Sequence, residues 1–251
     1  MDPAFQRRYQ DLEDWHWWFI GRRRVLMRLL DRYVKRSDGD SARVLDVGCG
    51  SGAMLVHLAR FGRPHGVDVN SEAVLRCQDR GFDAVVHESG PPLPFAAESF
   101  DLITALDVIE HVDDDGGLLR ELRRLVRPGG RLLVTVPAFG FLWGPHDEIN
   151  GHRRRYTAPQ LRERLVEAGW SPLRVSYFNT FLFPAVAAIR VLRPRRRRKP
   201  ARSDFELTRP GPLNAILARA FSLESPLVAR FDLRVGVSVL ALAQSAGPGD
   251  S

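Results

Sequence analysis

Short apolar segments alternate with amphipathic ones between residues 43 and 137, and this alternation restricts the fold more than any other feature of the chain. The segments predicted to form strands are 43–47, 65–69, 83–87, 100–106 and 131–137. Segments between them are predicted to be helical, including 52–60, 72–80 and 118–126. Strands that alternate with amphipathic helices predict an α/β fold with helices on both faces of a parallel sheet. Loops at the carboxyl ends of its strands gather at one edge, where ligands bind.

The rest of the chain surrounds this core. The predicted parts are a helical N-terminal cap (1–40), the core (41–180), an insertion (181–234), and a final strand with a tail (235–251). Two further strands are predicted at 173–178 and 235–242, on either side of the insertion. Of the 251 residues, 44% are hydrophobic, which is enough to bury a sizeable core.

A glycine-rich loop, VLDVGCGSG at 44–52, follows the first predicted strand. Gly48, Gly50 and Ala53 fit a dinucleotide-binding pattern, and Asp68 lies at the spacing that NAD enzymes use for the ribose. Asp46 argues against NAD, because its carboxylate would face the negative charges of a pyrophosphate. It suits a ligand that is positive there, such as an ammonium or a sulfonium group. S-adenosylmethionine (SAM) carries both groups, and Asp68 could accept hydrogen bonds from its ribose hydroxyls.

Four segments in order resemble a class I SAM-dependent methyltransferase: VLDVGCGSG, GVDVN (66–70), LPFAAESFDLITALDVIEH (93–111) and PGGRLLVTVP (128–137). The resemblance implies a Rossmann-like sheet of seven strands whose last strand is antiparallel. It also implies the cofactor SAM, with S-adenosylhomocysteine as product. The residues 173–178 and 235–242 would form the final pair of strands.

The resemblance assigns residues to parts of the cofactor. The methionine portion of SAM would contact Asp46, Gly48, Cys49 and Gly50. The ribose would contact Asp68 and Val69, and the adenine would contact Glu88 and Ser89. Leu106 and Asp107 would flank the cofactor. The N-terminal WHWWFIGRRR (15–24) resembles a cap of bacterial small-molecule methyltransferases, in which an arginine pairs with the cofactor carboxylate. Arg22 is the predicted arginine. Alternatively, the tryptophans attach a helix to the sheet and the arginines are solvated.

The methyl acceptor is expected beside the loop at 138–157, because this loop follows the fifth strand at the cofactor edge. His146 and His152 are the candidate general bases for an oxygen or nitrogen acceptor, and His111 is the next candidate. In the alternative interpretation, His146 and Asp147 only fold the loop, and the arginines at 153–155 are a solvated face. Glu110 and His111 alone are too few ligands for a metal, so no metal site is predicted.

The positive charge is concentrated in one tract. Eight basic residues without an acid lie there: Arg190, Arg193, Arg195, Arg196, Arg197, Arg198, Lys199 and Arg202. Without them the net charge of +7 would become −1. The apolar stretch 181–189 precedes the tract, and the pair indicates an element that binds an anionic membrane surface. The alternatives are a lid helix followed by a basic loop, or weakly specific RNA contact, and nucleic acid is the less expected partner.

These observations predict a SAM-dependent methyltransferase that modifies an oxygen or nitrogen atom of a small or lipid-linked molecule. The alternatives are a nucleic-acid methyltransferase, a SAM-binding protein without catalysis and, last, an NAD-dependent oxidoreductase. The only cysteines, Cys49 and Cys77, form no disulfide framework, and no signal peptide or spanning segment is evident. The protein is therefore expected in the cytoplasm, peripheral to the inner face of the membrane. The oligomeric state stays open.

Overall fold

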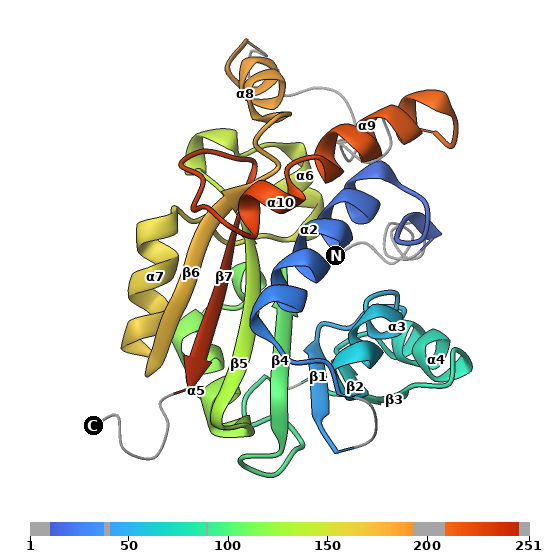
Figure 1. The fold of residues 1–251 in the computed structure, drawn as a ribbon, viewed down its shortest axis with the longest axis vertical. Helices are drawn as coiled ribbons and strands as arrows, with labels where there is room; N and C mark the ends of the chain where they lie inside the picture. The colour runs from blue at the N-terminus through green and yellow to red at the C-terminus, as the bar shows by residue number, and fades with distance from the viewer. Residues whose placement is uncertain (1–10, 38–40, 89, 193–208, 246–251) are drawn as a thin grey trace.

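A seven-stranded sheet forms the centre of the protein, in a computed structural model that describes residues 11–37, 41–88, 90–192 and 209–245 (Figure 1). The strands are β1 (Arg43–Val47), β2 (Arg63–Asp68), β3 (Asp83–Val86), β4 (Phe100–Leu106), β5 (Val126–Pro137), β6 (Trp170–Phe178) and β7 (Ser238–Ser245). Their order is β3-β2-β1-β4-β5-β7-β6. The first five strands pair in parallel, and β7 is antiparallel to both of its neighbours. The predicted fold class is confirmed.

Alternation of side chains along the strands divides the core between the two faces of the sheet. In β4, Ile103 and Ala105 belong to one apolar cluster, while Leu102 and Leu106 belong to the other. Helices α5 (Asp115–Leu125) and α7 (Ala158–Glu167) cover the first face. The second face is covered by α2 (Trp17–Tyr33), α3 (Leu55–Leu58), α4 (Ser71–Asp79), α9 (Pro212–Ser222) and α10 (Ser225–Val228). Helices on both faces are what an alternating sequence predicts.

Several boundaries differ from those predicted. The helix expected at 52–60 is reduced to α3 and a 3-10 turn, η1 (Ala59–Phe61), because the glycine loop keeps positive φ angles as far as Gly52. Strand β5 begins at Val126, where an irregular stretch pairs with Phe100 before regular pairing resumes. Strand β6 begins at Trp170 rather than 173, and β7 begins at Ser238 rather than 235. These changes lengthen or trim elements without altering their order.

The insertion contains α8 (Phe183–Leu192), α9 and α10. Helix α9 packs closely on α2, since a Cβ atom at Gly21 would lie only 2.3 Å from the Phe221 ring. Helix α8 projects from the end of the molecule in Figure 1, and none of its residues is buried. Within the described ranges, no helix combines the length and apolar character that crossing a bilayer requires. Most of the basic tract lies outside the described residues.

Candidate active site

A cavity of about 660 Å³ lies at the carboxyl ends of the central strands. Its wall includes the last residues of β1, β2, β4 and β5: Val47, Asp68, Leu106 and Pro137. We call the part lined by the glycine loop and Asp68 the cofactor end, and the part lined by a group of histidines the acceptor end. Residues of α2, α8 and α9 line the cavity as well: Trp17, Trp18, Arg22, Val186, Ile189, Arg190 and Leu217. The N-terminal helix and the insertion therefore border the same space as the sheet edge.

Backbone hydrogen bonds hold the glycine loop against β2. The Gly48 amide donates to the Val67 carbonyl at 2.8 Å, and the Gly50 amide donates to the Asp68 carboxylate at 2.9 Å. Gly48 has a φ of +72°, and a Cβ there would lie 2.7 Å from the Val108 side chain. Glycine is therefore required for both the backbone conformation and the close contact.

Asp68 has two roles in this arrangement. Its second carboxylate oxygen accepts a hydrogen bond from the Asn70 amide at 2.9 Å, which fixes the start of α4. The same residue lines the cavity, as Gly48, Gly50 and Val69 do. Burial raises the pKa of Asp68 despite these backbone donors. The predicted contact with a ribose stays a prediction, and any such ligand would share the carboxylate with the loop.

Asp46 and Cys49 lie behind the glycine loop, where they line a small adjoining hollow. The Thr104 hydroxyl donates to the Asp46 carboxylate, and burial raises the pKa of Asp46 to about 7. Glu13 was not among the predicted site residues. Its carboxylate accepts a hydrogen bond from the Ser51 hydroxyl and borders both the hollow and the cavity. Burial also raises the pKa of Glu13 to about 7. Two carboxyl groups near this loop are thus readily protonated.

Arg22 and Asp107, both predicted to bind the cofactor, form an ion pair with each other at the cavity wall. The guanidinium of Arg22 also stacks over the Trp18 ring at 4.6 Å. Asp107 accepts a further hydrogen bond from the Thr135 hydroxyl at 3.2 Å. Arg22 is therefore buried and paired rather than solvated. It would have to share its charge between Asp107 and a cofactor carboxylate.

The predicted adenine contacts are the least supported by the geometry. Glu88 is exposed, whereas its neighbours His87 and Gly90 line the cavity. Ser89 lies outside the described residues. Leu106, the other predicted flanking residue, does line the cavity.

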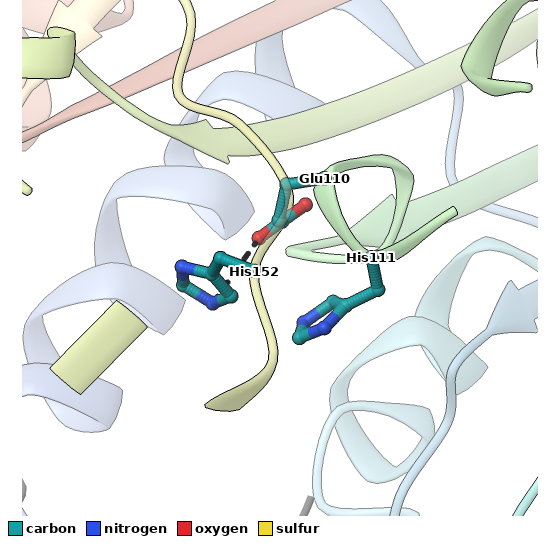
Figure 2. Close-up of side chains that lie close together, drawn as sticks. All are labelled: Glu110, His111 and His152. Atoms are coloured by element: carbon teal, nitrogen blue, oxygen red, sulfur yellow. Dashed lines mark ion pairs between the residues drawn. The ribbon is translucent and has the colours of Figure 1, made fainter. Parts of the chain in front are cut away.

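The three predicted catalytic histidines, His111, His146 and His152, all line the acceptor end of the cavity. Figure 2 shows His111 and His152. The rings of His111 and His152 are 4.8 Å apart, and those of His146 and His152 are 5.9 Å apart. His111 ends the turn η2 (Ile109–His111), and His146 lies in α6 (Pro145–Asn150), a helix that was not predicted. A hydrogen bond of 2.8 Å from the Arg153 amide to the Glu110 carbonyl joins the two segments.

His152 is held by a buried carboxylate. Its Nδ1 lies 2.8 Å from an oxygen of Asp147, and Arg155 donates to both oxygens of Asp147 at 2.8 and 3.0 Å. Burial alone would raise the pKa of Asp147, but the bonds from His152 and Arg155 hold it below its usual range. The interpretation of Arg155 as part of a solvated face is wrong, because this side chain is buried against Asp147.

The other two histidines are weak bases. Burial and the neighbouring His152 lower the pKa of His111 to about 4 and that of His146 to about 3. The Asn150 amide donates to Nε2 of His146 at 3.0 Å. Both rings are consequently neutral near neutral pH, and they accept hydrogen bonds or bind a ligand more readily than they take up a proton.

Glu110 completes the group, and its part in the site was not foreseen. The carboxylate is fully buried beside His152, with 3.9 Å between its Oε1 and Nε2 of that ring (Figure 2). Burial and the nearby Asp107 raise the pKa of Glu110 well above its usual value. The ligand atoms of Glu110, His111 and His152 all lie within 4.8 Å of one another. The prediction of no metal site assumed that Glu110 and His111 were the only ligands. That assumption is wrong, because the fold places His152 beside them as a third potential ligand.

A Rossmann-like sheet with a glycine loop and a cavity at its carboxyl edge defines a class of cofactor-binding enzymes. Within that class, the family model described as "Methyltransferase domain" matches residues 10–175, more than half of the chain. The protein therefore belongs to the methyltransferase domain family, as its resemblance to class I SAM-dependent methyltransferases predicted.

Two curated relatives are similar in sequence. The chain is 35% identical over 114 residues to the ubiquinone biosynthesis O-methyltransferase of Xanthomonas oryzae pv. oryzae (strain PXO99A), an alignment that covers 43% of this chain and 48% of that enzyme. It is 31% identical over 169 residues to a protein of Mycobacterium tuberculosis (strain ATCC 25618 / H37Rv) named as a probable S-adenosylmethionine-dependent methyltransferase, with 66% of this chain and 60% of the relative covered. The chain thus spans about half the length of the first relative.

Solved structures agree with the fold. The phosphoethanolamine N-methyltransferase 2 of Haemonchus contortus, solved with S-adenosyl-L-methionine, superposes with a TM-score of 0.58 at 19% identity. The superposition covers 88% of this chain and 52% of that one. At such low identity the likeness supports the fold alone.

Proposed function

We propose that the protein is a SAM-dependent methyltransferase that transfers a methyl group to an oxygen atom of a small molecule. The observation that carries this proposal is the continuous cavity, which joins the glycine loop and Asp68 at one end to the three histidines at the other. Family membership and the similarity to a ubiquinone biosynthesis O-methyltransferase support the reaction class.

The residues at the cofactor end fit SAM. Gly48 and Gly50 present backbone atoms to the cavity, and Asp46, Asp68 and Glu13 supply carboxylates to a ligand with positive groups. When bound, SAM supplies a methyl group already activated by the sulfonium. The chain has the remaining task of aligning an acceptor with that methyl group and keeping water away.

The cavity wall suits that task. Trp17, Trp18, Leu142 and Val186 provide apolar surface, while His146, His152 and Asn150 provide polar groups near an acceptor. The low pKa values of His111 and His146 make them poor proton acceptors at neutral pH. His152, whose ring is oriented by Asp147, is the remaining candidate to activate an acceptor hydroxyl.

Titration calorimetry with SAM, S-adenosylhomocysteine and NAD tests the cofactor. SAM and its product should bind with micromolar affinity, and NAD should not bind. Tighter binding of NAD would overturn the proposal. If SAM binds but no methylated product forms with any quinol, phenol or polyketide offered, a SAM-binding protein without catalysis becomes the better account.

We also infer that the acceptor is lipid-linked or apolar and reaches the cavity from an anionic membrane surface. Helix α8 supports this, because Val191 and Leu192 are 72% and 78% exposed while Val186 and Ile189 of the same helix line the cavity. The sequence continues from α8 directly into the basic tract. Apolar side chains next to cations are typical of elements that bind anionic bilayers.

Sedimentation with anionic liposomes at low and high salt tests this inference. Each cation near the surface contributes about 1 kcal/mol, and that attraction is screened by salt. Binding that survives high salt indicates insertion of α8, and binding lost at high salt indicates charge alone. The control replaces the four arginines at 195–198 with serine. If the wild-type protein stays in the supernatant at low salt, a soluble acceptor is favoured and the membrane inference fails, as does the predicted position at the inner face of the membrane.

A further inference from the structure

We propose that Glu110, His111 and His152 bind a divalent transition-metal ion at the acceptor end of the cavity. The ion would hold and activate the acceptor hydroxyl. This role rests on the proposed function, whereas the binding of the ion does not.

The three side chains lie around one point, as Figure 2 shows. Their ligand atoms are all within 4.8 Å of one another, and Nε2 of His152 is 3.9 Å from Oε1 of Glu110. Ligands at about 2.1 Å from a tetrahedral ion lie roughly 3.4 Å apart. Small side-chain rotations would therefore bring the three groups to coordination distance.

Glu110 is the strongest indication of a cation. Its carboxylate is fully buried, and neither oxygen receives a hydrogen bond from another residue in the part of the chain that the structure describes. Buried carboxylates normally have partners, since an unpaired one is costly. Protonation would remove the charge but leave the new O–H group without an acceptor. A metal ion between Glu110 and the two imidazoles would satisfy the carboxylate directly.

The orientation of His152 points the same way. Asp147 lies 2.8 Å from Nδ1, and a carboxylate held by Arg155 fixes the proton on that nitrogen. The lone pair of Nε2 then faces Glu110 at a distance too long for a hydrogen bond. Two electron-rich groups that face each other in a buried site favour a cation between them.

Outer partners of the ligands are also in place. Metal-binding histidines usually donate their second ring nitrogen to a carboxylate or a carbonyl. His152 has Asp147 for this purpose, and His111 forms a hydrogen bond with the backbone of Gly151. Each histidine can therefore present one nitrogen to an ion and keep its ring fixed with the other.

Two histidines and one carboxylate define the class of ion. This set binds Zn²⁺, Fe²⁺ and Co²⁺ and leaves positions open for other ligands. All three residues line the cavity, so an open position would face the acceptor. An ion lowers the pKa of a bound hydroxyl. The acceptor O–H would lose its proton to water, its oxygen would bond to the methyl carbon, and the carbon–sulfur bond would break with its electron pair left on sulfur.

The test is metal titration of the full-length protein, purified without a histidine tag and dialysed against a chelator. Zn²⁺ is followed by calorimetry and Co²⁺ by its visible absorption. We expect one ion per chain, and affinity at least about 100-fold lower in Glu110→Gln and in His111→Ala, since loss of an outer partner alone costs 10–100-fold. His57→Ala is the matched control, because His57 lies in α3 and does not line the cavity. It should retain the wild-type affinity.

The result is read separately from cofactor binding. Failure of Zn²⁺ and Co²⁺ to bind, or an equal loss in His57→Ala and His111→Ala, would overturn the metal site. Circular dichroism shows whether each variant is folded, and Glu110→Asp provides a second change at that position if Glu110→Gln does not fold. If the protein binds SAM but no metal, only the metal site is overturned. If it binds metal but neither SAM nor S-adenosylhomocysteine, the proposed function is overturned.

Discussion

The two ends of the cavity are built in different ways. At the cofactor end, one continuous loop is held by backbone hydrogen bonds to β2 and by the carboxylate of Asp68. At the acceptor end, two segments distant in sequence meet through side chains: Arg153 and Arg154 donate to the carbonyls of His111 and Val112, and Arg155 clamps Asp147. A motif in the local sequence marks the first end, whereas the second is defined by tertiary contacts without such a motif.

Electrostatics also separate the two ends. Burial raises the pKa values of Asp46 and Glu13 to about 7 at the cofactor end, and lowers those of His111 and His146 at the acceptor end. In both places burial favours the neutral form of each group. A cation at the first end would ionise carboxyl groups, while neutral imidazoles at the second are ready to bind. We therefore expect mutations at the two ends to affect different steps, although Asp107, which pairs with Arg22, also raises the pKa of Glu110.

The largest effect is expected at the acceptor end. His152→Ala should reduce turnover by about two to four orders of magnitude, the usual scale for a group that moves or activates a proton. The dissociation constant of SAM should stay near the wild-type value, because His152 contacts Asp147, Glu110 and the other two histidines rather than the glycine loop. Steady-state kinetics with calorimetry measures both. His57→Ala, in α3, is the control, and wild-type turnover in His152→Ala would exclude a role as either base or ligand.

The reverse pattern is expected at the cofactor end. Asp68→Ala should weaken SAM binding by about 1.5–3 kcal/mol, the scale of hydrogen bonds to a charged group. Turnover at saturating SAM should change much less. Asp68→Asn retains one oxygen acceptor and should weaken SAM binding less than Asp68→Ala. Asp83→Ala is the matched control, because Asp83 is exposed at the start of β3. Calorimetry that finds an unchanged dissociation constant in folded Asp68→Ala would show that this residue does not hold the cofactor.

The contrast explains what the sequence could predict. Apolar periodicity predicted the parallel strands and the helices between them, and glycines at fixed spacing marked the loop. The antiparallel last strand came from the resemblance to class I methyltransferases, and the order of the strands was not predicted. His111, His146 and His152 were chosen because they lie in or beside loops at the carboxyl edge of the sheet, and the structure brings all three to one cavity. Helix α6 was missed because its six residues, PHDEIN, show no apolar periodicity.

The contacts that the sequence did not predict share one physical cause: they join residues that only the folded chain brings together. Nothing near Glu110 in the sequence shows that His152 will lie beside it, since the two are joined only through the folded loop. The bond between Arg155 and Asp147 forms within that loop, yet burial of the pair depends on neighbouring elements. Glu13 approaches the glycine loop from the N-terminal segment in the same way. Pairs of this kind require the tertiary structure.

The smallest effect concerns the pH dependence of SAM binding. Because burial raises the pKa of Asp46 to about 7, this carboxyl is mostly protonated at about pH 6 and mostly ionised at about pH 8. An ammonium or sulfonium group prefers the ionised form, so affinity should fall roughly tenfold as pH decreases across this interval. Asp46→Asn should bind SAM more weakly than the wild type at high pH, and its affinity should change less with pH.

Glu13 has a similar pKa, so Glu13→Gln is measured alongside and should keep the tenfold change in SAM affinity if Asp46 causes it. Calorimetry at both pH values decides the matter, and equal wild-type affinities would mean that Asp46 supports the loop from behind rather than binding a positive group.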